Sequence, residues 1–167
     1  MQPRTIALLV TLLPLISANT AYLVSASAAY VPWCIPYIDG CTTISRAARH
    51  GDALFLFRAL MMLYAVLLIW YWWLVKLWLN KLDGQPTKIA MTIFWLGIIA
   101  ALFLIIYINF LGSTGSIYQF MRRYAVMFYV SLTPLAHMLM INHLKKLKTI
   151  KPDITVTTRI LYYKTSI

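Results

Sequence analysis

Acidic residues are scarce in this sequence of 167 residues. It contains no glutamate and only four acidic residues, against 15 lysines and arginines, so the formal net charge is +11. Hydrolysis by paired carboxylates needs two acids close together, and a carboxylate metal site needs several acids in one place. The acidic residues are Asp39, Asp52, Asp83 and Asp153. They lie far apart in the chain, and the sequence shows no nucleophile constellation and no phosphate-binding loop, so we expect no enzyme, no catalytic residue, no cofactor and no metal.

Charged residues of either sign are also few. They make up 11% of the chain, whereas 62% of the chain is hydrophobic. Soluble domains carry about 25% charged and about 45–50% apolar residues. This composition excludes a soluble domain and a disordered chain, and the two cysteines are too few for a disulfide-rich scaffold. An integral membrane protein is the class that remains.

Long apolar runs, by contrast, are abundant. A bilayer core of about 30 Å needs about 20 apolar residues in a helix, and a helix satisfies its own backbone hydrogen bonds in lipid. The segments that meet this requirement are residues 5–23, 53–75, 89–111 and 124–144. The sequence therefore predicts an all-α bundle of four transmembrane helices within residues 1–144, followed by a basic tail over residues 145–167.

The distribution of basic residues predicts the orientation of this bundle. If the amino terminus is inside, most lysines and arginines fall on the cytoplasmic side, as the positive-inside rule requires. Both termini are then cytoplasmic, and residues 24–52 form one structured outer loop. The compact loops favour a bacterial inner membrane. The positive-inside rule accounts for the net positive charge, so we expect no nucleic acid as a partner. The alternative is a signal peptide cleaved near residues 26–28, although residues 20–24 prolong the apolar run.

Cys34 and Cys41 both lie in the outer loop, with Pro36 and Gly40 between them. An oxidising compartment permits a disulfide, and the proline and glycine favour a chain that turns back and closes a small ring. We expect a structural disulfide. Two free thiols, or a metal or redox site, are the alternatives, and the sequence has no Cys-x-x-Cys motif.

Arg58 lies inside the second predicted span, and an arginine within a membrane span indicates a functional site. We expect it to pair with Asp39 or Asp52 and so to anchor the outer loop over the bundle. There are two alternatives. Its long side chain extends to the outer headgroups, or its guanidinium binds a lipid phosphate directly.

Polar residues in the later spans form a second candidate site. Thr133 and His137 share one face of the fourth span, and Asn109 lies in the third. We expect His137 to make an interhelical hydrogen bond. The alternative roles for this histidine are a haem or copper ligand and a proton relay.

Small residues recur at every fourth position in two of the spans. This spacing allows helix backbones to approach closely in lipid, so it predicts helix–helix contacts. The residues are Ser17, Ala21 and Ser25 in the first span, and Gly97 and Ala101 in the third.

A short motif in the outer loop, Pro-Tyr-Ile-Asp-Gly over residues 36–40, follows the first span. Gly51 and Phe55–Phe57 then open the second span, with Arg58 directly behind them. Over Pro32–Trp73 these features resemble the DRAM/Frag/Sfk family of polytopic membrane proteins, which carries a similar Pro-Tyr-Ile-Ser-Asp-x-Gly signature. The resemblance implies a non-catalytic membrane protein linked to lipid handling or membrane trafficking, in which the motif's aspartate shapes the loop.

We therefore expect a non-enzymatic membrane protein, either a lipid-interacting module or an accessory subunit of a larger membrane complex. Membrane lipids and other membrane protein subunits are the expected partners. Basic residues beside the inner leaflet attract anionic headgroups; those of the tail are Lys145, Lys146, Lys148 and Lys151. Two other functions stay open: a haem- or copper-binding redox subunit using His137 with His50 or His143, and a small transporter with Arg58, His137 and Asn109 as polar steps.

Overall fold

The structure, a computed structural model, describes residues 3–150, and this part of the chain contains helices and no strands. The helices are α1 (Pro3–Ser27), α2 (Pro36–Asp39), α3 (Ile44–Ala47), α4 (Gly51–Asp83), α5 (Lys88–Phe110) and α6 (Ser116–Ile150). Within the described residues, four of these helices, α1, α4, α5 and α6, are long and apolar enough to cross a membrane. The all-α prediction is confirmed, and the four long helices indicate a multi-pass membrane protein.

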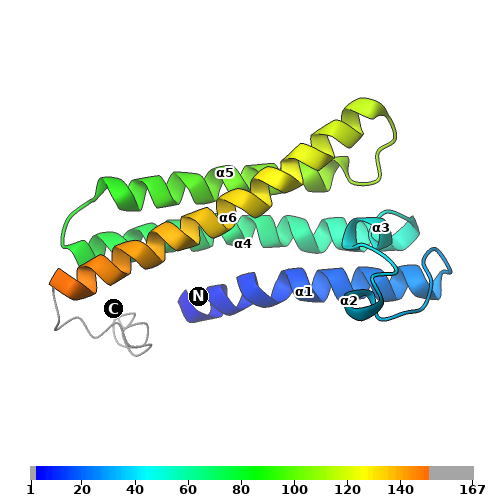
Figure 1. Cartoon of the computed structure of the whole chain (residues 1–167), viewed down its shortest axis with the longest axis horizontal. Coiled ribbons are helices and arrows are strands. Elements are labelled where there is room, and N and C mark those ends of the chain that lie inside the picture. Colours follow the sequence, from blue (N-terminus) through cyan, green and yellow to red (C-terminus); the bar gives the residue numbers. More distant parts are fainter. Residues whose placement is uncertain (1–2, 151–167) are drawn as a thin grey trace.

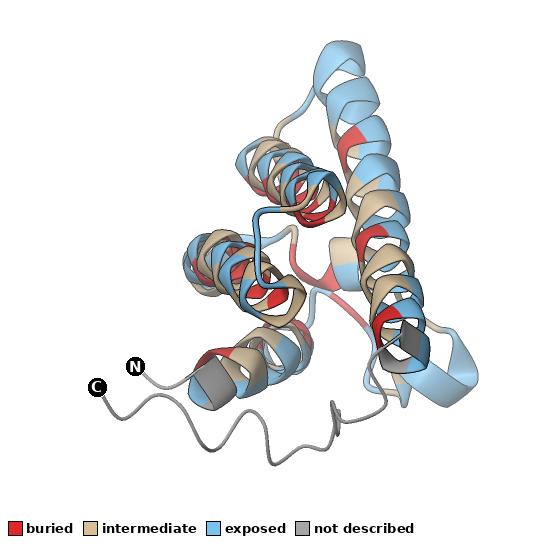
Figure 2. Ribbon diagram, turned by 90° about the vertical axis from the view of Figure 1, so that its left-hand side faces the viewer, coloured by how far each residue is buried: buried red, intermediate tan, exposed pale blue. Residues whose placement is uncertain are grey.

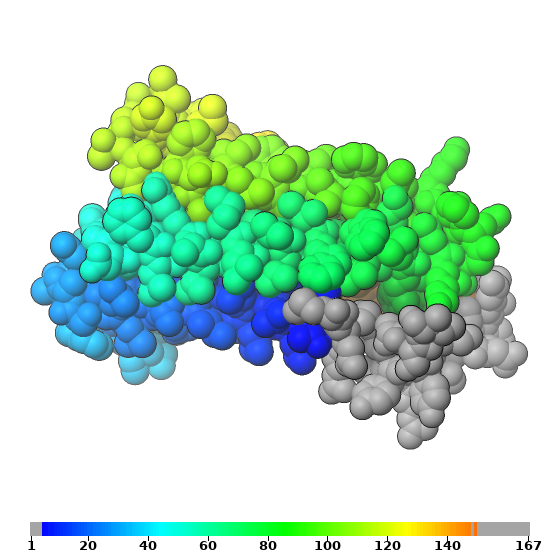
Figure 3. Space-filling model, turned by 180° about the vertical axis from the view of Figure 1, so that it is seen from behind, coloured from blue at the N-terminus to red at the C-terminus, as the bar shows by residue number. Residues whose placement is uncertain are grey.

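α1, α4 and α5 lie side by side in chain order, and α6 lies across α4 and α5 (Figure 1). α1 packs on α4, α4 on α5, and α5 on α6, with successive helices antiparallel. Figure 3 shows α1, α4 and α5 along the face opposite α6, which crosses the bundle obliquely in Figure 1. We call one end of the bundle the disulfide end, because it holds residues 28–50 and 111–115. The opposite end, with residues 84–88 and the last turns of α6, is the lysine end.

Turn residues determine where α4 ends and α5 begins. Gly84 follows α4 with a left-handed φ of 82°, and its N–H donates to the Asn80 carbonyl at 3.1 Å. Thr87 then caps α5, because its hydroxyl accepts a hydrogen bond from the N–H of Ala90 at 3.4 Å. This short turn holds α4 and α5 antiparallel.

Several helices extend beyond the predicted spans. α4 continues through residues 76–83, beyond the predicted span 53–75. α6 begins at Ser116 rather than at residue 124 and continues into the predicted tail. Hydropathy marks only the part of a helix that lies in hydrocarbon, whereas lysine, leucine and glutamine are good helix formers outside it. Residues 151–167 of the tail lie outside the described residues.

The core lies between α4 and α5, where Trp72 is completely buried. Gly97 of α5 faces the indole: a Cβ placed on Gly97 would lie 2.3 Å from its ring atoms. The glycine therefore provides the space that the indole occupies. Ser17, Ala21, Ser25 and Ala101 are also buried, so the predicted contact positions are confirmed. In Figure 2 the buried residues lie on the sides of the helices that face one another.

Candidate functional site

Arg58 lies in α4, about two turns from the start of the helix, and its side chain turns toward the end of α5. Its Nη2 donates to the Asn109 carbonyl at 3.0 Å and to the Leu111 carbonyl. The last carbonyls of a helix lack intrahelical partners and carry the negative end of the helix dipole. The expected pairing with Asp39 or Asp52 is therefore wrong, because the carbonyls of α5 take the place of a carboxylate.

The two aspartates make local contacts instead. The Oδ2 of Asp39 accepts a hydrogen bond from the N–H of Ile35 at 2.8 Å, which closes the turn that contains α2. Asp52 is exposed in the first turn of α4, where the helix dipole favours an acidic side chain. Neither aspartate reaches across to another long helix.

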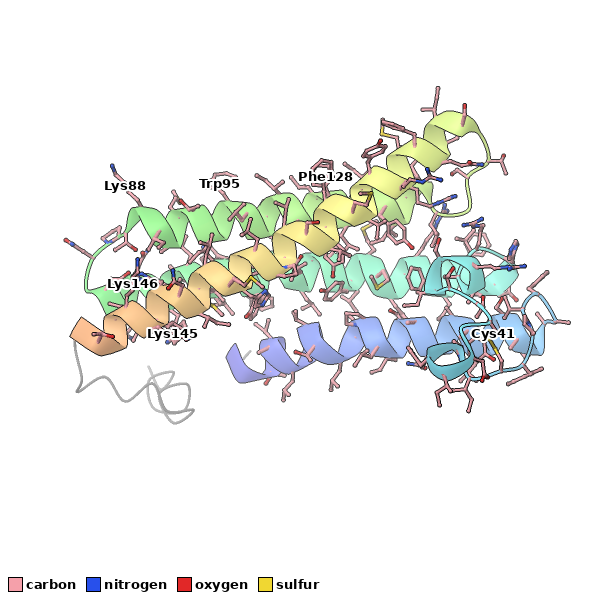
Figure 4. All side chains as sticks on the ribbon, in the orientation of Figure 1. Cys41, Lys88, Trp95, Phe128, Lys145 and Lys146 are labelled. Atoms are coloured by element: carbon pink, nitrogen blue, oxygen red, sulfur yellow. A yellow bond between two sulfur atoms is a disulfide. The ribbon has the colours of Figure 1, made fainter. Side chains whose placement is uncertain are left out.

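Tyr22 of α1 anchors the loop that Arg58 was expected to hold. Its hydroxyl accepts a hydrogen bond from the Cys34 N–H at 2.9 Å and donates to the Cys34 carbonyl at 2.8 Å. Cys34 is joined to Cys41 by a disulfide with a Cα–Cα distance of 6.7 Å, at the end of the bundle where Figure 4 labels Cys41. Among the cysteine alternatives, the structure has the disulfide. The sequence did not predict this role of Tyr22, because no motif or spacing distinguishes Tyr22 from the other aromatic residues of the apolar spans.

Two further arginines gather near the end of α5. The Nη2 of Arg49 donates to the Ser45 hydroxyl at 3.5 Å. Arg49 and Arg122 both lie near the hydroxyl of Tyr107, which lies beside Ser45. Two like charges thus lie at the same end of the bundle, the disulfide end. In the sequence these arginines contribute only to the predicted topology, and nothing in their spacing places them near each other.

Among the described residues, no carboxylate lies within ion-pair distance of these arginines. The one carboxylate found that close to a basic side chain within residues 3–150 is that of Asp83, whose Oδ2 lies 3.0 Å from His143 Nε2 at the other end of the bundle. The Nε atoms of Arg49 and Arg58 are buried and have no hydrogen-bond partner. A buried donor without a partner costs free energy, so these guanidinium groups are equipped to bind an anion.

His137 packs against aromatic side chains of α4. Its Nδ1 lies 2.8 Å from the Thr133 carbonyl, which can only accept, so this nitrogen is the donor. The ring stacks on Tyr71 at an interplanar angle of 22° and meets the edge of Trp72, with centroids 4.7 Å apart. The hydrogen bond of His137 is therefore within α6, not interhelical as predicted.

Asn109 does not join His137 in a polar site. It is exposed at the end of α5, and its Nδ2 donates to the Ile105 carbonyl at 2.9 Å. The three residues proposed as transporter steps are thus separated, since Arg58 lies with Asn109 and His137 lies farther along the bundle. In the described part of the chain, no group of three or more His, Cys, Asp or Glu side chains is placed to hold a metal ion.

Two polar contacts that sequence reasoning missed join α4 to α6. The hydroxyls of Tyr64 and Tyr129 lie 2.9 Å apart within the bundle. At the lysine end, Nε2 of His143 lies 3.0 Å from Oδ2 of Asp83, which also accepts a hydrogen bond from the Thr87 hydroxyl at 2.9 Å. His143 lies near the end of the last predicted span, and Asp83 lies between the second and third. Their shared cytoplasmic side in the predicted topology could have indicated this pair.

The lysines of α6 lie at the end opposite the disulfide. Lys145 and Lys146 are exposed there, and Lys88 at the start of α5 lies at the same end (Figure 4). Lys76 of α4 places its Nζ 4.9 Å above the centroid of the Phe94 ring. The side chain of Lys148 and the whole of Lys151 lie outside the described residues.

No family model, curated protein or solved structure matches the chain. The resemblance to the DRAM/Frag/Sfk family stays a prediction.

The role of Arg58 can be tested by its removal. We expect Arg58→Ala to lower the free energy of unfolding by about 1–2 kcal/mol, because two terminal carbonyls of α5 lose a charged donor. Denaturant unfolding in detergent micelles, followed by circular dichroism, measures this change. Arg46→Ala is the matched control, since Arg46 is exposed at the same end. Equal stabilities of the two variants would contradict the capping role.

Proposed function

We propose that this chain is a non-enzymatic integral membrane protein that interacts with anionic lipid and can serve as an accessory subunit of a larger membrane complex. The observation that carries the proposal is an apolar belt with a basic group at each end. Exposed Trp95 and Phe128 lie along the middle of the bundle, with Lys88, Lys145 and Lys146 at one end (Figure 4). The arginines of the other end complete the arrangement.

This charge pattern supports lipid binding on physical grounds. Each lysine or arginine beside an anionic leaflet contributes roughly 1 kcal/mol of attraction. Some polar side chains inside the bundle make internal contacts, such as the Tyr64–Tyr129 hydrogen bond. The basic groups that face outward lie at the two ends, where lipid headgroups lie.

Lipid retention tests the proposal. Protein extracted in a mild detergent and analysed by native mass spectrometry is expected to keep anionic phospholipid in excess of its share of the membrane. Zwitterionic phospholipid is the internal reference in the same sample. Retention in proportion to abundance would contradict lipid selectivity. The subunit role is tested by purification of the wild-type chain in mild detergent. We expect another membrane protein to be recovered with it in stoichiometric amount.

The orientation is part of the proposal. We infer a bacterial inner membrane, with both termini in the cytoplasm and the disulfide end outside. After mild reduction of intact spheroplasts, a membrane-impermeant maleimide is expected to label Cys34 and Cys41. Labelling that appears only after the membrane is permeabilised would contradict this orientation.

A further inference from the structure

A cluster of three arginines surrounds the end of α5. We call Arg49, Arg58 and Arg122 the arginine cluster; they come from the residues before α4, from α4 and from α6. The guanidinium of Arg58 reaches the carbonyls of α5, and Arg49 and Arg122 both lie near Tyr107, one turn before the end of that helix. Segments far apart in the sequence thus bring their positive charge to one place.

The backbone supports this convergence. The carbonyl oxygen of Arg49 lies 3.6 Å from the place that a Cβ on Gly112 would occupy, so the start of α4 is close to the residues that follow α5. Gly112 has a φ of 85°, a left-handed value that glycine adopts without strain. The loop after α5 therefore turns beside Arg49 and brings α6, with Arg122, back toward it.

The arginine cluster has hydrogen-bond donors to spare. Each guanidinium carries five N–H donors, and the hydrogen bonds of Arg58 to α5 use one nitrogen. Its Nε and that of Arg49 are buried without a partner, and among the described residues no carboxylate lies within ion-pair distance of the cluster. Extension of the side chains to water does not explain these buried atoms, because it would place the guanidinium groups in solvent. Arg46 and Arg123 behave in that way, since both are exposed.

We infer that the arginine cluster binds the phosphate group of an anionic phospholipid at the disulfide end. The inference rests on the proposed lipid interaction and specifies its site. A guanidinium matches phosphate oxygens with two parallel hydrogen bonds, and the cluster lies where the apolar belt ends. Phe55 and Tyr118, from the same ends of α4 and α6, are exposed and present apolar surface for the acyl chains.

The test uses the full chain in nanodiscs made of phosphatidylglycerol and phosphatidylcholine in equal amounts. The site variant is Arg49→Gln with Arg122→Gln, which leaves Arg58 on α5. The matched control is Arg46→Gln with Arg123→Gln, which removes the same charge from the same end. A third variant, Lys145→Gln with Lys146→Gln, removes charge at the lysine end. Native mass spectrometry after release from the nanodisc gives the phosphatidylglycerol retained, and circular dichroism confirms that each variant is folded.

We expect the site variant to retain phosphatidylglycerol about tenfold less than the wild type, since charge-assisted hydrogen bonds are lost. Both other variants are expected to retain it within a factor of about two of the wild type, because the diffuse attraction of exposed basic residues to a leaflet ends when the protein is released from the nanodisc. A separate titration of the wild type with inorganic phosphate in micelles distinguishes the source of the anion. Protection from thermal unfolding by millimolar phosphate, without lipid retention, would replace the lipid by free phosphate.

The outcomes separate this inference from the proposed function. If the site variant and its matched control lose phosphatidylglycerol equally, or if neither loses it, the inference is wrong. If only the lysine variant loses it, lipid interaction stands and its site is at the other end. If the wild type shows no preference for phosphatidylglycerol, both the inference and the proposed function fail. If the site variant does not fold, Arg49→Lys with Arg122→Lys takes its place. Full retention of phosphatidylglycerol by this variant would contradict recognition of the phosphate by guanidinium groups.

Discussion

Substitution of Gly97 by valine is expected to lower the free energy of unfolding by about 3 kcal/mol or more, or to prevent α4 and α5 from packing. The reason is steric. The first atom added at this position would lie 2.3 Å from the indole of Trp72, which is completely buried. Because the clash is with the rigid body of the ring, α5 must move away or Trp72 must leave the core. Unfolding in detergent, followed by circular dichroism and tryptophan fluorescence, measures the change.

A double-mutant cycle tests whether the contact between position 97 and Trp72 causes the penalty, rather than the replacement of a glycine within the helix. Trp72→Leu is expected to remove much of the penalty of Gly97→Ala, because a smaller side chain leaves room for the added methyl group. Thr92→Val is the control on the exposed side of α5, and we expect it to change stability by less than about 0.5 kcal/mol. A penalty at Gly97 that persists with leucine at position 72 would show that the contact is not its cause.

Loss of the Asp83–His143 pair is the second large effect. The side chains of Asp83 and His143 are 6% and 12% exposed, and a buried polar group that loses its hydrogen-bond partner typically costs about 1–3 kcal/mol. We expect Asp83→Ala to approach the upper end of that range. His143 would lose its partner, and the Thr87 hydroxyl would lose its acceptor at the start of α5. Chemical unfolding of the variant in micelles measures the loss.

The position of the pair makes its structural consequence specific. Asp83 ends α4 and His143 belongs to α6, so the pair is expected to fix the lysine end of α6 on α4. Cross-linking of cysteines introduced at exposed positions of the two helices should fall in Asp83→Ala at that end. Lys146→Ala is the control, because Lys146 is exposed on the same helix. An unchanged cross-linking yield in Asp83→Ala would contradict the role of the pair.

The sequence predicted the small-residue contacts correctly because a close approach of helices in lipid depends on residue size at fixed spacing. Gly97 and Ala101 recur at that spacing and are buried. The partner of Gly97 could not be predicted in the same way. Four tryptophans lie in residues 70–78, and the rotation of α4 decides which of them faces α5.

The error at Arg58 has a physical explanation as well. In the sequence an arginine suggests a carboxylate partner, and the nearest candidates were Asp39 and Asp52. Backbone carbonyls have no signature of their own in a sequence, yet those at a helix end accept a charged donor as readily. The end of α5 lies beside Arg58 only because α4 and α5 are antiparallel and in register, so the contact depends on the tertiary structure.

Hydropathy alone determined that the chain forms helices of membrane-spanning length, because lipid requires every backbone group to be satisfied within its own helix. The sequence also determined that basic groups lie at both ends of the apolar belt, because lysines and arginines flank the apolar runs. The tertiary structure alone decided which polar residues meet. Arg49, Arg58 and Arg122 gather, and Asp83 finds His143, through the register and crossing of helices. The register and the crossing of helices depend on side-chain packing between segments. The order of residues within one segment does not determine that packing.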